Sequence, residues 1–258
     1  MMNTKSNKFL NFRNKVVLVT GSNGIIGSEL CRLFLDLGAF VFGIDNKKNS
    51  IKNSNYTHFV GDVANENFVI KKLTEIIKKK SKIDIILNGA AVSIFTHFEK
   101  RTKKEIYKTL NVNLIGTHNV IKNYVKLHSK KKLTSCRIIN FGSIYGVNSP
   151  DFRIYKNNDR FSSEIYGATK ASIIQMTKYL SVMYVKKNIF INCISPGGTI
   201  AEKSKISKKF KKRYASRTPI GRMATPKDLF TAVIYLANSE TKYTVGQNIL
   251  VDGGLTAW

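Results

Sequence analysis

The chain has 258 residues, 43% of them apolar, which is enough to bury one large core. Its formal net charge is +27, and a charge of this size attracts polyanions whatever the fold. No stretch is long and apolar enough to span a bilayer, and residues 1–15 lack the apolar run of a secretory signal. We therefore expect one domain over residues 1–258, with residues 1–14 as a short N-terminal extension, in a cytoplasmic protein without a membrane partner.

The positive charge is spread along the chain rather than gathered in one place. Lysine-rich runs occur in most of the predicted helices, which is typical of solvated faces in a protein of biased composition. A nonenzymatic nucleic-acid-binding protein is the alternative that the charge raises. Basic and aromatic residues do not alternate as they do in a nucleic-acid groove, so we do not expect nucleic acid as a partner.

The sulfur and imidazole side chains do not predict a metal site. Cys31, Cys136 and Cys193 each lie within an apolar segment, so we predict buried free thiols. The four histidines lack the spacing of metal ligands, and we expect no metal.

Short runs rich in β-branched residues alternate with amphipathic helical segments. The runs are residues 16–20, 40–45, 58–60, 83–87, 136–141, 188–195 and 247–251. Strands that are apolar throughout are expected where helices cover both faces of a sheet. The pattern predicts an α/β protein: a Rossmann-type, doubly wound parallel sheet in a three-layer α/β/α arrangement.

A glycine-rich turn follows the first predicted strand. The segment TGSNGIIGSEL places Gly21, Gly24 and Gly27 between that strand and the first helix. Glycines allow a tight turn there, and the first N–H groups of the helix face an anion, so the segment predicts a pyrophosphate site. A purely structural turn is the alternative.

Acidic residues follow the next two strands. Asp45 ends the second strand, 18 residues after Gly27, where such a fold presents a carboxylate to the adenosine ribose. A carboxylate repels a 2′-phosphate, so NAD is favoured over NADP. Lys47 and Lys48 weaken this preference, and NADP is not excluded. Asp62 either contacts the adenine or is a turn carboxylate.

Tyr166 is the only one of the 11 tyrosines that is followed four residues later by a lysine. Positions i and i+4 of a helix share a face, so the phenol and the Lys170 ammonium can converge. A nearby cation favours the phenolate, and we expect Lys170 to lower the pKa of Tyr166 toward the working range of an acid–base catalyst.

These motifs resemble the short-chain dehydrogenase/reductase family in order and spacing, from about residue 15 to residue 258. The matching segments are LNGAA (87–91), NVNLIG (111–116), RIINFGSIYG (137–146), Tyr-x-x-x-Lys (166–170), NCISPGGT (192–199), TPIGRM (218–223) and GQNILVDGG (246–254). Gly89 and Ala91 depart from the family's Asn-Asn-Ala-Gly segment. The glycine turn has the spacing of the family's longer members, whereas the chain has the length of its compact ones.

The resemblance implies roles for individual residues. Tyr166 would exchange the proton on the substrate oxygen and Lys170 would bind the nicotinamide ribose. Ser143 would hydrogen-bond the reacting oxygen, and Asn113 would hold a water that links Lys170 to solvent. The implied cofactor-binding residues are Gly21, Asn23, Gly24, Ile26, Gly27, Asp45, Asp62, Val63, Asn88, Gly89, Ala90, Tyr166, Lys170, Pro196, Gly197 and Thr199. A turn serine, a helix-kink asparagine and a structural proline–glycine turn are the alternative interpretations of Ser143, Asn113 and the 196–199 segment.

Two segments are expected to cover the substrate. Tyr166 follows Ser143 by 23 positions, a longer separation than in typical compact members, and this insertion should hang over the site. SIYG, PDFRIY, NCISPGG and the final DGGLTAW are similar to flagellin-modification oxidoreductases of legionaminic-acid pathways, which implies a sugar derivative as substrate. The second segment, residues 202–214, holds seven Lys or Arg residues and would attract an anionic sugar, or be only a solvated basic lid.

The sequence thus predicts an NAD(P)-dependent oxidoreductase that interconverts a secondary alcohol and a ketone on a small-molecule sugar phosphate or nucleotide sugar. An NADPH-dependent 3-oxoacyl-[acyl-carrier-protein] reductase is the alternative within the family, although Asp45 and the insertion oppose it. The resemblance also implies a homotetramer or homodimer built through the long helices that carry Asn113 and Tyr166.

Overall fold

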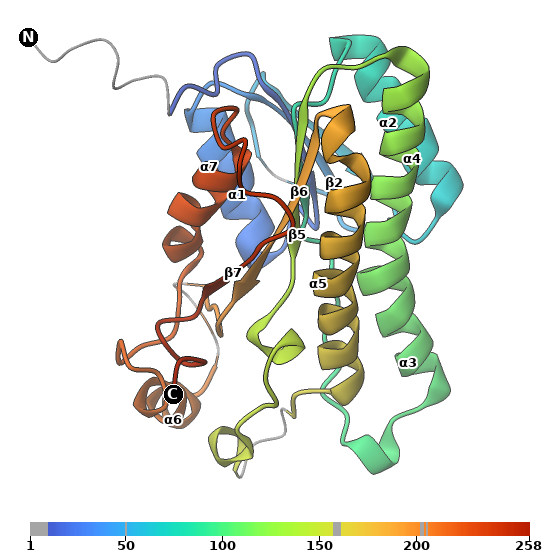
Figure 1. Cartoon of the computed structure of the whole chain (residues 1–258). Helices are drawn as coiled ribbons and strands as arrows, with labels where there is room; N and C mark the ends of the chain where they lie inside the picture. The colour runs from blue at the N-terminus through green and yellow to red at the C-terminus, as the bar shows by residue number, and fades with distance from the viewer. Residues whose placement is uncertain (1–9, 50, 157–160, 202–203, 205) are drawn as a thin grey trace, which may run out of the picture.

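The computed structural model describes residues 10–49, 51–156, 161–201, 204 and 206–258, and their backbone forms a layered α/β structure (Figure 1). One sheet runs through its centre. Its strands are β1 (Val16–Thr20), β2 (Phe40–Asp45), β3 (Tyr56–Val60), β4 (Ile85–Asn88), β5 (Cys136–Phe141), β6 (Ile189–Pro196) and β7 (Asn248–Val251). They pair in parallel in the order β3-β2-β1-β4-β5-β6-β7. The predicted doubly wound fold is confirmed, and every predicted strand is present with its ends within two residues.

Helices cover both faces of the sheet. They are α1 (Ile25–Asp36), α2 (Glu66–Lys80), α3 (Lys103–Leu110), α4 (Gly116–Lys131), α5 (Glu164–Tyr184), α6 (Lys208–Ser216) and α7 (Phe230–Ala237). Figure 1 shows α2, α4 and α5 on one side of the sheet and α1 and α7 on the other. The layers arise because each crossover between parallel strands must return over one face of the sheet.

Each face has its own apolar core. Val69, Leu73 and Tyr124 of α2 and α4 pack with one set of strand side chains, and Leu30 and Phe34 of α1 pack with the other set. β1 is buried along its whole length, as expected for a strand covered on both faces.

The three cysteines are buried free thiols, as the sequence predicted. Cys31 lies in α1, Cys136 in β5 and Cys193 in β6. Cys193 lies close enough to Lys170 for the two groups to influence each other's pKa.

The strand order reverses its direction at β1, which has β2 on one side and β4 on the other. In open α/β sheets, ligands bind outside the carboxyl ends of the strands at such a switch point. The turn after β1, the segment after β4 and the segments after β5 and β6 all lie at this end, so it is where the site is expected.

Candidate functional site

The turn between β1 and α1 depends on its glycines. Gly21 has a φ of +70°, and a Cβ on it would lie 2.7 Å from the carbonyl oxygen of Gly89. A Cβ on Gly27 would lie 2.1 Å from the carbonyl oxygen of Gly21. The turn and the helix therefore pack backbone against backbone. Gly24 caps α1 without a side-chain hydrogen bond, which leaves the first N–H groups of the helix to an anionic ligand.

A hollow of about 930 Å³ opens beside this turn. Of the predicted cofactor-binding residues, it is lined by Gly21, Asn23, Gly24, Asp45, Asp62, Val63 and Ala90. Residues from the carboxyl ends of β1, β2, β3 and β4 thus meet at one surface.

The Asp45 carboxylate organises the loop that borders this hollow. It accepts hydrogen bonds from the backbone N–H groups of Asn23, at 3.0 Å, and Lys47, at 3.1 Å. The Asn23 amide donates to the carbonyl oxygen of Lys47 at 2.7 Å, and Nε2 of His58 lies 2.8 Å from the same oxygen. Sequence reasoning did not identify His58 as a support for this loop, because its distance in the chain from Lys47 gives no signal.

The second part of the site is a chamber of about 310 Å³, called the reaction chamber below. Its lining includes the predicted residues Ile26, Gly27, Gly89, Ser143, Tyr166, Lys170, Pro196, Gly197 and Thr199. The chamber and the larger hollow share Ala91 as a lining residue, so they are neighbouring parts of one site.

Ser143 and Tyr166 converge in the reaction chamber. Ser143 follows β5, and its Oγ accepts the N–H of Tyr145 at 3.2 Å. Tyr166 lies in the first turn of α5, whose N-cap Ser163 accepts the Tyr166 N–H at 3.3 Å. The side chain of Ser143 hydrogen-bonds the Tyr166 phenol, which lowers the pKa of that phenol.

Lys170 lies one helical turn after Tyr166 along α5. Its Nζ lies 5.6 Å from the centroid of the Tyr166 ring and donates to the carbonyl oxygen of Phe141 at 2.7 Å. Lys170 is only 3% exposed, and burial lowers its pKa to about 8.

The net pKa direction of Tyr166 differs from the expectation. Burial raises the pKa of the phenol, and this effect exceeds the lowering by Ser143. Burial also disfavours the charge of Lys170, whose Nζ donates to the carbonyl oxygen of Phe141, and the Lys170 ammonium does not reverse the direction of the Tyr166 shift. The phenol of this structure is therefore a proton donor at neutral pH rather than a ready base.

Asn113 lies in a π-helical turn, η2 (Asn111–Ile115), between α3 and α4. Its Oδ1 accepts the N–H of Val92 at 2.8 Å, and its Nδ2 donates to the Val92 carbonyl oxygen and to Thr169, both at 3.1 Å. The side chain thus connects the segment after β4 to α5. This placement supports the helix-kink interpretation, and π-turns are frequent at functional sites.

Asn88 is the predicted cofactor residue that does not line either part of the site. It is buried in β4 and donates from Nδ2 to Oδ1 of Asn140, its partner in β5, at 2.9 Å. Asn140 in turn donates to Thr177 of α5 at 2.9 Å. Asn88 is therefore linked through Asn140 to α5, while its own Oδ1 is buried without a hydrogen-bond partner among the described residues.

The segment after β6 approaches the same chamber. Thr199 donates from Oγ1 to the carbonyl oxygen of Gly197 at 3.1 Å. The N–H of Gly198 donates to the hydroxyl of Tyr214, which is buried in α6. Tyr214 thereby holds α6 against the carboxyl end of β6, a contact that sequence reasoning missed because it considered only the basic residues of the 202–214 segment.

The insertion and α6 form one cover over the site. Ile154 and Tyr155 from the insertion pack with Phe210, Tyr214 and Met223 in a separate apolar cluster. Arg217 forms an ion pair with Asp151 at 2.8 Å, and Arg213 donates to the carbonyl oxygen of Lys156. Figure 1 shows both segments at the same end of the molecule. Of the insertion, Ile144, Tyr145, Tyr155 and Ser162 line the reaction chamber, and residues 157–160 lie outside the described part.

The described residues of the basic segment do not line the reaction chamber. In α6 the buried side chains are Phe210 and Tyr214, whereas Lys208, Lys209 and Lys212 are exposed. Of the residues that the structure describes, Lys170 is the single charged one that lines the reaction chamber. Residues 202, 203 and 205 of the basic segment lie outside the described part of the chain. An anionic group would therefore meet the basic residues described here outside the chamber.

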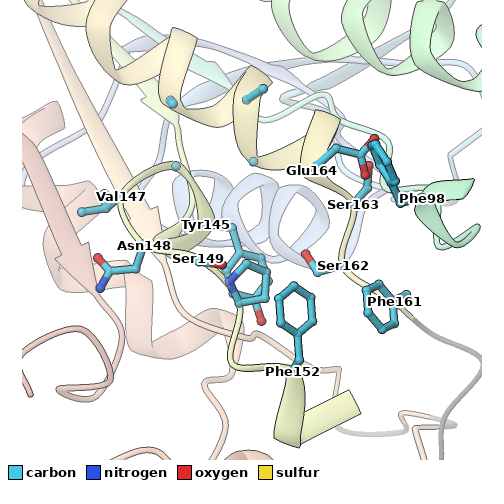
Figure 2. Close-up of a pocket in the computed structure, with 15 residues that line it drawn as sticks. Phe98, Tyr145, Val147, Asn148, Ser149, Phe152, Phe161, Ser162, Ser163 and Glu164 are labelled. Atoms are coloured by element: carbon cyan, nitrogen blue, oxygen red, sulfur yellow. The ribbon is translucent and has the colours of Figure 1, made fainter. Parts of the chain in front are cut away.

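Tyr145 and Ser162 line a second hollow besides the reaction chamber. This outer groove, of about 450 Å³, is lined by Phe98, Val147, Pro150, Phe152 and Phe161 among others (Figure 2). The rings of Phe152 and Phe161 stack with their centroids 5.1 Å apart.

Within the described ranges, no group of three or more His, Cys, Asp or Glu side chains could hold a metal ion. No helix in the same ranges is long and apolar enough to cross a membrane.

Residues 22–256 match the family profile described as enoyl-(acyl carrier protein) reductase. An uncharacterized oxidoreductase of Schizosaccharomyces pombe is 32% identical over 94% of this chain and 91% of its own length. A 3-oxoacyl-[acyl-carrier-protein] reductase of Chlamydia trachomatis is 28% identical over 94% of this chain and 97% of its own.

A solved short-chain dehydrogenase from Leptospira borgpetersenii, with bound NAD⁺, superposes with a TM-score of 0.90. It is 37% identical, and the match covers 99% of this chain and 97% of the other. The fold, the glycine turn and the convergence of Ser143, Tyr166 and Lys170 agree with these matches, and the chain is an oxidoreductase of the short-chain dehydrogenase/reductase family.

Proposed function

We propose that the protein interconverts a secondary alcohol and a ketone with NAD(H), on a sugar derivative. The observation that carries this proposal is the convergence of Ser143, Tyr166 and Lys170 in one chamber that adjoins the hollow beside Asp45. When bound, the nicotinamide supplies the hydride acceptor for alcohol oxidation and the hydride donor for ketone reduction.

Each catalytic residue has one task in this chemistry. In reduction, Tyr166 donates its phenolic proton to the oxygen of the substrate as the carbon gains a hydride. Ser143 donates a hydrogen bond to that oxygen, because its Oγ already accepts the Tyr145 N–H and keeps its own proton to donate. Lys170, whose Nζ donates to the carbonyl oxygen of Phe141, would bind the nicotinamide ribose.

The cofactor-binding residues support NAD. The glycine turn and the uncapped α1 N-terminus suit the pyrophosphate, and the Asp45 carboxylate suits a ribose with two free hydroxyls. The Leptospira relative is described with bound NAD⁺, which supports the same choice. We retain NADP as the weaker alternative, since Lys47 lines the same hollow.

The lining of the reaction chamber supports a polyhydroxylated substrate. Seven lining residues carry a hydroxyl group: Ser93, Ser143, Tyr145, Tyr155, Ser162, Tyr166 and Thr199. Hydroxyl groups both donate and accept, which suits a sugar better than a carboxylate or a bare alkyl chain. A phosphate or nucleotide of the substrate would extend toward the exposed basic cover.

The sequence likeness to flagellin-modification and legionaminic-acid oxidoreductases supports a role in a surface-glycan pathway. We propose that the protein acts in such a pathway as a cytoplasmic enzyme.

We also propose that the protein is a homodimer or homotetramer. Large apolar side chains are exposed on α5, among them Val182, which is 77% exposed, and Tyr179 and Met183.

The direct test is incubation of the purified protein with NAD⁺ and a panel of sugar phosphates and nucleotide sugars. Formation of reduced nicotinamide, followed by its absorbance, is the expected result for at least one sugar. A protein that binds NADH but oxidises no member of the panel would contradict the proposed substrate class.

A 3-oxoacyl-[acyl-carrier-protein] reductase is the second candidate. Relatives of that name are 27–29% identical over 94–95% of this chain. The outer groove beyond Tyr145 is apolar and could accept an acyl chain. Reduction of acetoacetyl-coenzyme A with a clear preference for NADPH over NADH would favour this candidate, whereas Asp45 and the insertion favour the first.

A further inference from the structure

We propose that Tyr155, held by Tyr145, is a specificity-determining residue that hydrogen-bonds a hydroxyl on the carbon next to the reacting carbon. The proposal rests on the proposed alcohol–ketone chemistry and names the group that this chamber selects. The structural relationship that supports it is a pair of phenol hydroxyls, Tyr145 Oη and Tyr155 Oη, 2.6 Å apart.

Both phenols line the reaction chamber together with Tyr166. Tyr145 comes from η3 (Ile144–Gly146), directly after Ser143, and Tyr155 ends η4 (Phe152–Tyr155) in the insertion. Tyr155 is close enough to Tyr166 that its charge would raise the pKa of the Tyr166 phenol. The insertion thus places a second phenol in the chamber that holds the Tyr166 phenol.

The surroundings keep the pair in place. Tyr155 is 7% exposed, and its ring packs against Phe210 of α6 in an edge-on contact with centroids 5.6 Å apart. Tyr145 is fixed at its backbone, since its N–H donates to Ser143 and its carbonyl oxygen would lie 2.8 Å from a Cβ on Gly167. Rigid support of this kind is what a specificity contact needs.

The chemistry of the pair suits a neutral hydroxyl. Burial raises the pKa of Tyr145, so its phenol stays protonated. Two neutral phenols can offer both a donor and an acceptor to a ligand, but they offer no charge to a carboxylate. A site built from buried hydroxyls rejects an analogue that lacks the matching hydroxyl, because the protein groups then lose their partner.

The experiment compares two secondary alcohols that differ by one hydroxyl: trans-1,2-cyclohexanediol and cyclohexanol. Oxidation of each by NAD⁺ is measured for the wild-type protein, Tyr155→Phe, Tyr145→Phe and the double variant. Tyr243→Phe, which removes a phenol hydroxyl from a fully exposed position, is the matched control. NADH dissociation constants and thermal unfolding are measured for every protein.

The wild-type protein is expected to prefer the diol over cyclohexanol in kcat/KM by about tenfold, and each single variant to lose most of that preference through a higher KM for the diol. The double variant should resemble the single ones, because the two hydroxyls act as a pair. Tyr243→Phe should keep the wild-type ratio.

Three results would overturn the proposal. They are equal kcat/KM values of the wild-type protein for the two alcohols, no oxidation of the diol by a wild-type protein that binds NADH, or an unchanged ratio in Tyr155→Phe. A merely structural role of Tyr155 would lower both rates together and leave the ratio intact. Failure of the wild-type protein to bind NADH would instead contradict the proposed function, so the two failures are distinguishable.

Discussion

The Lys170 ammonium is buried against the carbonyl oxygen of Phe141, 2.7 Å away, and no carboxylate contributes to the shift of its pKa. The charge is therefore desolvated without an opposite charge to compensate it, an arrangement that costs stability. The free-energy cost of this buried charge can be measured.

We predict that Lys170→Met is more stable than the wild-type protein at pH 7, although it loses turnover. The fall in pKa from 10.5 to about 8 corresponds to about 3 kcal/mol, and loss of the bond to Phe141 reduces the gain, so about 1–3 kcal/mol is expected. Denaturant unfolding measures the difference. Lys178→Met, on an exposed position of the same helix, is the control.

The pH dependence of this stability has a defined sign. Because the folded pKa is lowered, the unfolded chain holds the proton of Lys170 between about pH 8 and pH 10.5 while the folded chain has lost it. The destabilisation is thus complete below about pH 8 and is relieved as the pH rises toward 10.5. Lys170→Met should lack this gain in the free energy of unfolding. If the free energy of unfolding of the variant and of the wild-type protein changed with pH by the same amount, the buried charge would be contradicted.

Catalysis should also depend on pH in a direction that the structure sets. Burial raises the pKa of Tyr166, so the phenol is protonated at neutral pH. Ketone reduction, which needs the proton, should proceed at neutral pH and decline under alkaline conditions, whereas alcohol oxidation should rise with pH. Initial rates in both directions test this. An oxidation rate that falls between about pH 7 and pH 9 at saturating substrate would contradict it.

The glycine turn gives a prediction that separates cofactor binding from general stability. In Gly27→Ala the new Cβ would meet the Gly21 carbonyl oxygen at 2.1 Å, so the turn must shift. We expect a stability loss of about 1–3 kcal/mol and NADH binding weakened at least about tenfold. Gly221→Ala is the control. Gly221 has a φ of +75°, so an alanine there is strained, but nothing lies within 4 Å of the added Cβ. This variant should therefore lose stability without weakening NADH binding.

Much of the fold, and the placement of Tyr166 and Lys170 in one chamber, could be predicted from the sequence because both depend on local spacing. The alternation of apolar strand segments with amphipathic helical segments predicted the parallel sheet. The i and i+4 spacing predicted that Tyr166 and Lys170 share a helix face, and both line one chamber. Asn88 shows the limit of such spacing. Its motif predicts a cofactor contact, and the spacing gives no sign that its Nδ2 donates to Asn140 in β5.

The chamber's cover could not be predicted, because it depends on contacts between segments far apart in the chain. Tyr155 meets Phe210 and Tyr145 only after the insertion folds onto α6. The pKa of Tyr166 is a second example, since the degree of burial that raises it follows from packing and not from the distance to Lys170 along the helix.

Asp45 provides a test of cofactor preference. Asp45→Asn removes the charge that repels a 2′-phosphate, and its single amide oxygen keeps one of the two acceptors that Asp45 offers to the N–H groups of Asn23 and Lys47. The ratio of the NADPH and NADH dissociation constants should shift toward NADPH by about tenfold, as two dissociation titrations would show. Asp36→Asn, at the exposed end of α1, should leave the ratio unchanged. A wild-type protein that already binds NADPH more tightly would contradict the assignment of NAD.

The central claim is that the Tyr166 phenol transfers the proton beside a bound nicotinamide. Its most direct test is Tyr166→Phe, which removes one oxygen and keeps the ring, with turnover and NADH affinity measured on the same preparation. We predict a loss of turnover of at least about a hundredfold with an NADH dissociation constant close to that of the wild-type protein. A variant that retains most of its turnover would contradict the account.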